Sequence, residues 1–192
     1  MVKPSILALM LVAFAASGPL LAGPLDDAKA ALERSDDAVA FDLLKPLGDA
    51  GDADAQFALG TLFDLGRFVR KNPTEASRWY RLAATQGHAI AQHNLAHMLE
   101  ESEGGSPSPY DRAAAATWYG RAAAQGYRPA QGNLGILHAS GSGVRRDDVE
   151  AYKWLKLAGS TENLEHVARR MTAEQIAEGD RRAAEWQARP ER

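Results

Sequence analysis

The chain has 192 residues, of which 37 are alanine, and 45% of its residues are hydrophobic. Because alanine favours helices and buries little surface, this composition excludes one large β-sheet core and a transmembrane bundle. The net charge of -3 excludes the basic surface that nucleic-acid binding needs, and the lack of cysteine excludes disulfides and thiolate-ligated metal sites.

The first 22 residues have the layout of a signal peptide. Lys3 precedes an uncharged run over residues 6–16, which is followed by small residues and prolines. This run is shorter than the about 20 residues that cross the hydrocarbon core of a bilayer. The sequence therefore predicts a signal peptide over residues 1–22 and a mature protein that is periplasmic or secreted, with no membrane segment after cleavage. Retention of the run as a membrane anchor is the alternative.

Residues 25–52 are predicted to form an N-terminal capping pair of helices. They look like a degenerate copy of the helix pairs that follow them. Pro46 is expected to bend or shorten the second of these helices, because proline lacks the N–H group that a helix interior uses.

Three repeats follow, and each carries one tryptophan. Trp79, Trp118 and Trp154 are spaced by 39 and 36 residues, whereas an Ala-Gln pair begins at positions 55, 91 and 130, spaced by 36 and 39. The longer spacing comes first for the tryptophans and second for the Ala-Gln pairs, because the connector within the middle repeat has three extra residues. Self-similarity at this period indicates stacked helix pairs. The repeats are predicted at residues 53–88, 89–127 and 128–160.

Each repeat is predicted to contain two helices joined by a connector. The first helix should end at Gly66 in the first repeat and at Gly141 in the third, because glycine accepts the left-handed conformation that follows many helices. Asn72, Asp111 and Asp147 each lie seven residues before a tryptophan, where their side chains are expected to cap the second helix. The second helices of the first two repeats should stop at a Gln-Gly pair.

Other residues recur in register between the repeats. Alanines recur at several such positions, which predicts close contacts between helices, with the tryptophan filling the remaining space. Asn94 and Asn133 share one register position, where we expect a structural side-chain hydrogen bond. Glu75 and Glu150 lie three residues after the expected caps, which is the spacing of a capping box.

Residues 161–189 are predicted to form C-terminal capping helices. Thr172 is followed by Glu174 and Gln175, a pattern that opens a last helix running to about residue 189. Trp186 on this helix is expected to serve packing. Residues 190–192 are expected to fray.

At these residues the chain resembles the Sel1-like repeat proteins, relatives of the tetratricopeptide solenoids. The family pattern runs from alanine and Leu-Gly through a Gly-x-Gly-Val connector to Ala-x-x-Trp-Tyr-x-x-Ala-Ala-x-x-Gly, and the third repeat matches it at Gly141–Val144, Ala151 and Trp154. The second repeat lacks the Gly-x-Gly-Val connector, and the third has Leu155 in place of tyrosine. The resemblance implies an all-α fold, a right-handed α-solenoid of stacked antiparallel helix pairs.

No catalytic motif stands out, so we interpret the chain as a protein that is not an enzyme and binds no cofactor. It has no Gly-x-Ser-x-Gly, no Ser-x-x-Lys and no glycine-rich phosphate loop. His93 and His97 have zinc-ligand spacing on a helix, with Glu100 and Glu101 after them. Because the other repeats carry different residues there, we interpret the pair as part of an exposed, variable helix face. Zinc binding by this pair is the alternative.

The resemblance implies a binding module. In such solenoids the first helices line the concave face, and the positions that vary between repeats form the recognition surface. We therefore predict a monomeric periplasmic adaptor that binds a protein or peptide partner, with a partly exposed Phe57 as the anchor. The predicted contact residues are Phe57, Thr61, Asp64, His93, His97, Glu100 and Ile136.

Two alternative functions stay open. Some secreted Sel1-like proteins are described as β-lactamases or penicillin binders, which implies a cell-wall or penicillin-related hydrolase or binder. Those proteins carry cysteine pairs in each repeat, and this chain has no cysteine. The other alternative is a metal-responsive scaffold that uses His93 and His97.

Overall fold

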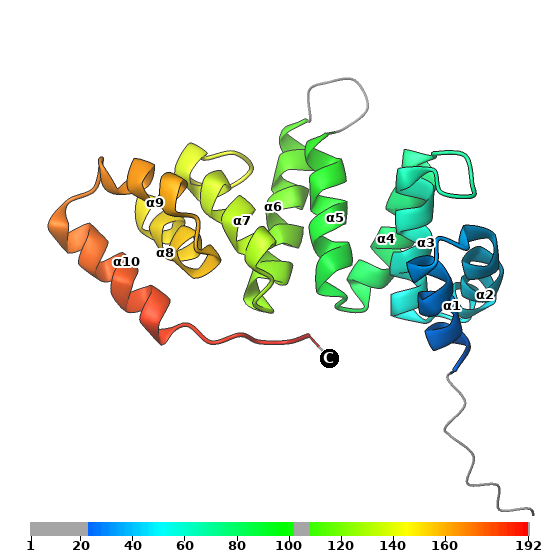
Figure 1. Ribbon diagram of the computed structural model, residues 1–192. Coiled ribbons are helices and arrows are strands. Elements are labelled where there is room, and N and C mark those ends of the chain that lie inside the picture. The colour runs from blue at the N-terminus through cyan, green and yellow to red at the C-terminus, as the bar shows by residue number, and fades with distance from the viewer. Residues whose placement is uncertain (1–22, 102–107, 192) are drawn as a thin grey trace, which may run out of the picture.

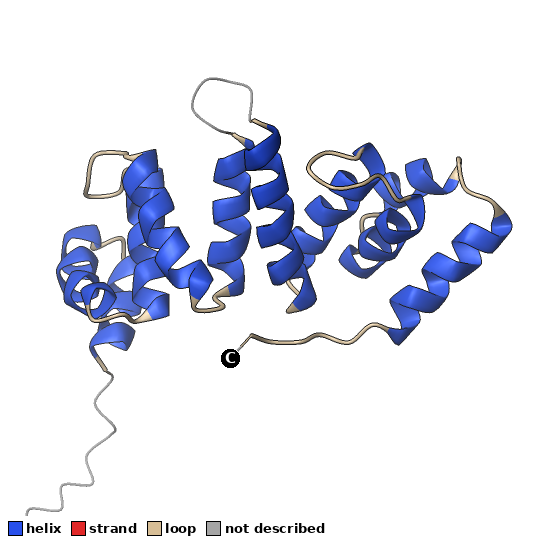
Figure 2. Cartoon of the chain, turned by 180° about the vertical axis from the view of Figure 1, so that it is seen from behind, coloured by secondary structure: helices blue, strands red, loops and turns tan. Residues whose placement is uncertain are grey.

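The computed structural model describes residues 23–101 and 108–191, and all regular structure in these two ranges is α-helical (Figures 1 and 2). The predicted signal peptide, residues 102–107 and Arg192 lie outside the described residues. Inside them, no helix combines the length and the apolar character that crossing a bilayer would take. The predicted all-α fold is confirmed.

The helices of the described ranges are stacked in sequence order. They are α1 (Pro24–Glu33), α2 (Asp37–Asp49), α3 (Ala53–Leu65), α4 (Pro73–Thr85), α5 (Ala89–Glu100), α6 (Pro109–Ala124), α7 (Arg128–Ser140), α8 (Asp148–Ala158), α9 (Thr161–Ala168) and α10 (Ala173–Glu185). From α1 to α9 each helix packs mainly against its neighbours in the chain, whereas α10 packs against α8, and Figure 1 shows one continuous array from α1 to α10. This is the predicted solenoid of helix pairs, in which α3–α4, α5–α6 and α7–α8 are the three repeats.

Alanines occupy the contacts between helices, as their register predicts. Ala55, Ala91 and Ala130, one near the start of each first helix, are fully buried. Trp79 and Trp154 are buried beside such positions, with 2% and 8% of their surface exposed. Small residues therefore let the helices approach, and the tryptophans supply bulk to the core.

The residue after each tryptophan lies deeper still. Tyr80, Tyr119 and Leu155 are exposed by 1% or less. Tyr80 and Leu155 each pack against a glycine of the preceding helix, because a Cβ atom at Gly60 would lie 2.6 Å from the Tyr80 ring and one at Gly135 would lie 2.7 Å from Leu155. The glycine of the Leu-Gly pair thus leaves the space into which the side chain after the tryptophan packs.

The predicted helix ends are confirmed in the first and third repeats. Gly66 and Gly141 adopt left-handed backbone with φ of 70° and 76°. Asn72 and Asp147 cap α4 and α8, where their side chains accept backbone N–H groups. The Gln-Gly pairs likewise follow the ends of α4 and α6.

The second helix of the middle repeat begins earlier than predicted. Ser108, and not Asp111, is the N-cap of α6. The Asp111 N–H donates to Ser108 Oγ at 3.2 Å and the Ser108 N–H donates to the Asp111 carboxylate at 3.0 Å, which together form a capping box. The capping boxes predicted with Glu75 and Glu150 are wrong, because these carboxylates pair instead with Arg78 and Lys153, each at 3.0 Å.

Two predictions at the ends of the array are also wrong. Pro46 does not shorten α2, which continues to Asp49, because Leu44 and Gly48 on the same helix are buried in the core and hold it against α3. The helix α10 ends at Glu185, short of residue 189, because Trp186 turns to extended backbone with φ of -72° and ψ of 139°.

Candidate binding site

Three buried glutamines connect each repeat to the helix before it. Gln56, Gln92 and Gln131 donate from their side-chain amides to the carbonyl oxygens eight residues earlier, at 3.0, 3.1 and 3.2 Å. Buried amides need such partners, so these bonds set the position of each first helix. The predicted site residues do not include these glutamines, although the Ala-Gln register marks all three.

The glutamines of the Gln-Gly pairs reinforce the same turns. The Gln86 amide donates to Gln56 Oε1 at 2.8 Å and to the Gly51 carbonyl at 2.9 Å. The Gln125 amide makes the equivalent bonds to Gln92 Oε1 at 2.8 Å and to the carbonyl of Gly87 at 2.9 Å. Each of these two turns between repeats is therefore held by a pair of side-chain amides.

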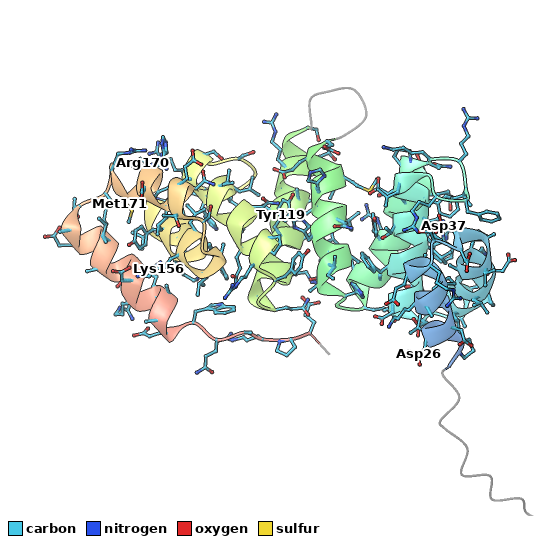
Figure 3. All side chains as sticks on the ribbon, viewed as in Figure 1. Asp26, Asp37, Tyr119, Lys156, Arg170 and Met171 are labelled. Carbon is cyan, nitrogen blue, oxygen red and sulfur yellow. The ribbon has the colours of Figure 1, made fainter. Side chains whose placement is uncertain are left out.

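Three of the predicted site residues hydrogen-bond the buried tyrosines. The Tyr80 hydroxyl donates to Thr61 Oγ1 at 3.3 Å and to Asp64 Oδ2 at 3.4 Å. The Tyr119 hydroxyl donates to Glu100 Oε2 at 2.8 Å, and Figure 3 places Tyr119 in the middle of the array. These polar residues of α3 and α5 therefore have a structural task within their own repeats.

The asparagines in register contribute to the same clusters. Burial raises the pKa of Tyr80 and of Tyr119 because it disfavours the phenolate, and Glu100 adds to this effect at Tyr119. The side chains of Asn94 at Tyr80 and of Asn133 at Tyr119 act in the opposite direction on the pKa. The structural hydrogen bond expected for the two asparagines stays a prediction.

Phe57 and His93 share one register position and are both half-buried. The Phe57 ring stacks on His88 with 4.6 Å between ring centroids and also contacts Tyr80. The His93 ring lies 5.3 Å from Tyr119 and 5.2 Å from Tyr127, again between centroids. Burial, followed by the neighbouring His97, lowers the pKa of His93, whose buried Nδ1 has no hydrogen-bond partner within the described residues. Rings of other helices therefore cover a large part of both side chains.

His97 and Ile136 are the predicted site residues with the most exposed side chains. His97 is 53% exposed and its Nδ1 lies 3.4 Å from a carboxylate oxygen of Glu101. Ile136 is 44% exposed on α7. Within the described ranges, no cluster of three or more histidine and acidic side chains has the geometry to hold a metal ion, so the structure adds no third ligand to His93 and His97.

A pocket of about 530 Å³ lies between the first two repeats. Its lining consists of Asp64, Lys71, Pro73, Thr74, Ser77, Asn94, His97, Met98, Leu99 and Glu101. It joins two of the predicted residues, Asp64 and His97, which come from different repeats. Phe57, Thr61, His93, Glu100 and Ile136 are not part of the lining. Charged and amide groups together with two apolar side chains of α5 suit a protein segment that carries both kinds of group.

Comparison with known proteins identifies the repeats. The model of the Sel1 repeat matches the chain three times, at residues 53–88, 89–127 and 128–160. The chain belongs to the Sel1 repeat family. No curated protein matches it.

Two solved structures are similar to this Sel1 repeat chain. A Sel1 repeat protein from Oxalobacter formigenes is 33% identical with a TM-score of 0.57, and the match covers 67% of this chain and 98% of the other. A protective antigen with an SLR fold, present in uropathogenic Escherichia coli strains, is 22% identical over 77% of this chain and 48% of the other, with a TM-score of 0.37. Sel1 repeat proteins generally mediate protein–protein interactions and are typically non-catalytic scaffolds.

Proposed function

We propose that this Sel1 repeat protein is a non-catalytic, periplasmic or secreted adaptor that binds a peptide or protein segment along its first helices, α3, α5 and α7. The observation that carries the proposal is the pocket between the first two repeats, to which Asp64 and His97 both contribute. A segment bound there would contact two repeats at once, which is how solenoids build extended recognition surfaces.

The lining of the pocket favours a peptide over a purely charged ligand. Lys71 and His97 supply positive or neutral donors, whereas Asp64 and Glu101 supply acceptors, so no single sign of charge prevails. Met98 and Leu99 add apolar surface. Polar groups would hydrogen-bond the backbone of the segment, and the apolar side chains would receive one of its side chains.

The proposed contact residues differ in whether their side chains already contact other residues of the protein. His97 and Ile136 have exposed side chains and are the direct contacts that we propose. Thr61, Asp64 and Glu100 already bond the buried tyrosines, so they can offer a partner only their remaining acceptor positions. Phe57 and His93 would contribute the exposed parts of their rings.

The proposed location rests on the layout of residues 1–22 together with the family. An N-terminal positive charge and a short apolar run are typical of a secretory signal. Sel1 repeat proteins in bacteria are often extracellular or periplasmic. The adaptor would therefore meet its partner outside the inner membrane.

Site-specific photocrosslinking in secreting bacteria tests the proposed surface. A photoreactive residue at His97 or at Ile136 should give a discrete adduct with a partner protein. The same residue at Leu82, which is exposed on the second helix α4, is the matched control and should give none. Ser77→Trp, which fills the pocket, should remove the adduct at position 97, whereas Thr85→Trp at an exposed position of the same helix should keep it.

Equal adducts at positions 82 and 97, or an adduct at 97 that survives Ser77→Trp, would overturn the proposed surface. Hydrolysis of a chromogenic β-lactam by the purified protein would overturn the proposal that it is non-catalytic. Both experiments use the full chain, and the crosslinking works without knowledge of the partner's identity.

A further inference from the structure

Pro190 and Glu191, part of the stretch 190–192 that is predicted to fray, instead continue a segment that leaves α10 and runs back along the array. Figure 1 shows it leaving α10 and passing beneath α7 and α6. The Trp186 ring packs edge-on against Trp154 with 6.1 Å between centroids, and the Arg189 N–H donates to the Ala124 carbonyl oxygen at 2.7 Å. Residues 186–191, here called the strap, therefore lie on the turns between the repeats. Arg192 is outside the described residues.

The strap places one carboxylate in a set of three donors. Arg121 Nε donates to Glu191 Oε1 at 2.8 Å, and a second guanidinium nitrogen donates to Oε2. The Gln92 side-chain amide also donates to Oε2, at 2.9 Å. Two parallel bonds from one guanidinium are the strongest way in which a protein side chain recognises a carboxylate. The guanidinium of Arg121 accordingly lowers the pKa of Glu191.

This carboxylate site departs from the repeat pattern. Arg121 lies three residues after its tryptophan, where the first and third repeats carry Leu82 and Leu157. A leucine is thus compatible with the fold at this position, so the fold by itself does not require an arginine there. Its guanidinium stacks over Trp118, 4.8 Å from the ring centroid, and points its remaining donors at Glu191.

The other side of the site is built into the turn between α4 and α5. Gln92 is buried and is already positioned by its bonds to the Ala84 carbonyl and to Gln125. Gly87 leaves the space in which the strap lies, because a Cβ atom there would sit 2.9 Å from Glu191 Cβ. The donors are therefore held in position before a ligand binds, and Gly87 leaves space beside them. The strap fits this site as an extended segment.

The strap is held by few contacts. Its residues Gln187 to Pro190 are largely exposed, and the Arg121 and Glu191 side chains are still 37% and 26% exposed. Attachment to α10 nonetheless keeps the strap at an effective concentration of about millimolar near the site. Another segment of similar chemistry could therefore compete for it.

We propose that Arg121, Gln92 and Gly87 form a second binding site, which takes an extended segment of a protein partner with a carboxylate side chain, and which the strap fills until that segment displaces it. The strap itself defines the chemistry of the partner: extended backbone over the turns and a glutamate side chain at the guanidinium. This site lies on the turns between repeats and is separate from the pocket lined by His97, so it does not depend on the proposed function of that pocket.

Peptide binding to a shortened protein tests this proposal. The shortened variant ends at Glu185, and circular dichroism checks that it stays folded. The probe is a labelled peptide, acetylated and amidated at its ends, with the sequence of residues 186–192, Trp-Gln-Ala-Arg-Pro-Glu-Arg. Fluorescence anisotropy should show that the peptide binds the shortened variant about tenfold or more tightly than the full chain, in which the strap occupies the site.

Three controls establish that the carboxylate site is responsible. Arg121→Leu, in the shortened variant, should weaken binding by about tenfold, as should Glu191→Gln in the peptide, because each removes the charge-assisted pair. Arg81→Leu removes the same charge from an exposed position of α4 and should leave binding unchanged. A peptide of the same composition in scrambled order should bind about tenfold more weakly.

Several results would overturn the proposal. Absence of binding to the shortened variant, equal binding by its Arg121→Leu form, or equal binding of the scrambled peptide would each exclude a specific exchangeable site. A full chain that is dimeric in light scattering, and that becomes monomeric on Glu191→Gln, would show that the occupant is the strap of a second copy and not a partner protein. None of these outcomes bears on crosslinking at His97.

Discussion

The hydroxyl of Tyr119 donates a hydrogen bond of 2.8 Å to the carboxylate of Glu100 and joins α6 to α5 in the middle repeat. Tyr80 makes the corresponding bonds to Thr61 and Asp64 one repeat earlier. Acidic residues on the first helices are thus bound to the second helices of their own repeats. The polar face that we propose for partner binding thus consists partly of residues that join the two helices of a repeat.

Removal of the Tyr119 hydroxyl should destabilise the middle repeat. We expect Tyr119→Phe to lower the free energy of unfolding by about 1 to 2 kcal/mol, because a hydrogen bond to a charged acceptor contributes about this much. Urea unfolding followed by circular dichroism measures the change. Tyr127→Phe, at a tyrosine whose hydroxyl has no hydrogen bond within the described residues, is the control and should have little effect. Equal losses in the two variants would contradict this role of Glu100.

Two glycine substitutions separate packing from helix propensity. Gly60→Ala places a Cβ atom 2.6 Å from the Tyr80 ring, so we expect it to lower the free energy of unfolding by about 1 to 3 kcal/mol. Gly120→Ala on α6 meets no atom within 4 Å and should raise it by about 0.5 to 1 kcal/mol, because alanine favours a helix. Urea unfolding compares both variants with the parent. A tolerated Gly60→Ala would show that α3 and α4 can move apart.

The stability of the protein should depend on the protonation of His93. Burial lowers the pKa of His93 from its ordinary value of 6.5, so the unfolded chain binds this proton more readily than the folded protein does. The contribution is therefore fully present above pH 6.5 and is lost as the pH falls through 6.5 towards the lower pKa of the folded state. His93→Phe introduces the residue that the first repeat carries in this register and should reduce the loss.

Urea unfolding at about pH 7.5 and about pH 5.5, on either side of the ordinary histidine pKa, measures this effect. The free energy of unfolding should fall less between the two pH values for His93→Phe than for the parent protein. His166→Phe replaces an exposed histidine of α9 and serves as the matched control, which should keep the pH dependence of the parent. A pH dependence that is unchanged in His93→Phe would exclude His93 as its source.

The predicted signal peptide should be cleaved from the protein during export. We expect the protein expressed with residues 1–22 in Escherichia coli to be recovered from the periplasm with a mass that shows cleavage near residue 22. Mass spectrometry of the intact protein after cell fractionation measures both. Recovery of the full-length chain in the membrane fraction would instead support retention of residues 6–16 as an anchor.

The sequence alone determined the repeat architecture and most helix ends. Each of these features depends on residues close together in the chain: the register of the alanines and tryptophans, the left-handed Gly66 and Gly141, and the caps Asn72 and Asp147. The error at Asp111 arose between two residues three positions apart, because serine and aspartate are both favoured N-caps and the helix begins at the earlier one, Ser108.

Only the tertiary structure decided which surface residues are available to a partner. Phe57 and His93 are shielded by rings of other helices, and Glu191 is bound by Arg121 and Gln92, which are 70 and 99 residues away in the chain. No periodicity marks such contacts, because they depend on how stacked repeats bring distant side chains together. The sequence by itself thus determines the helices and their order, whereas burial and charge pairing across the turns follow from the stacking.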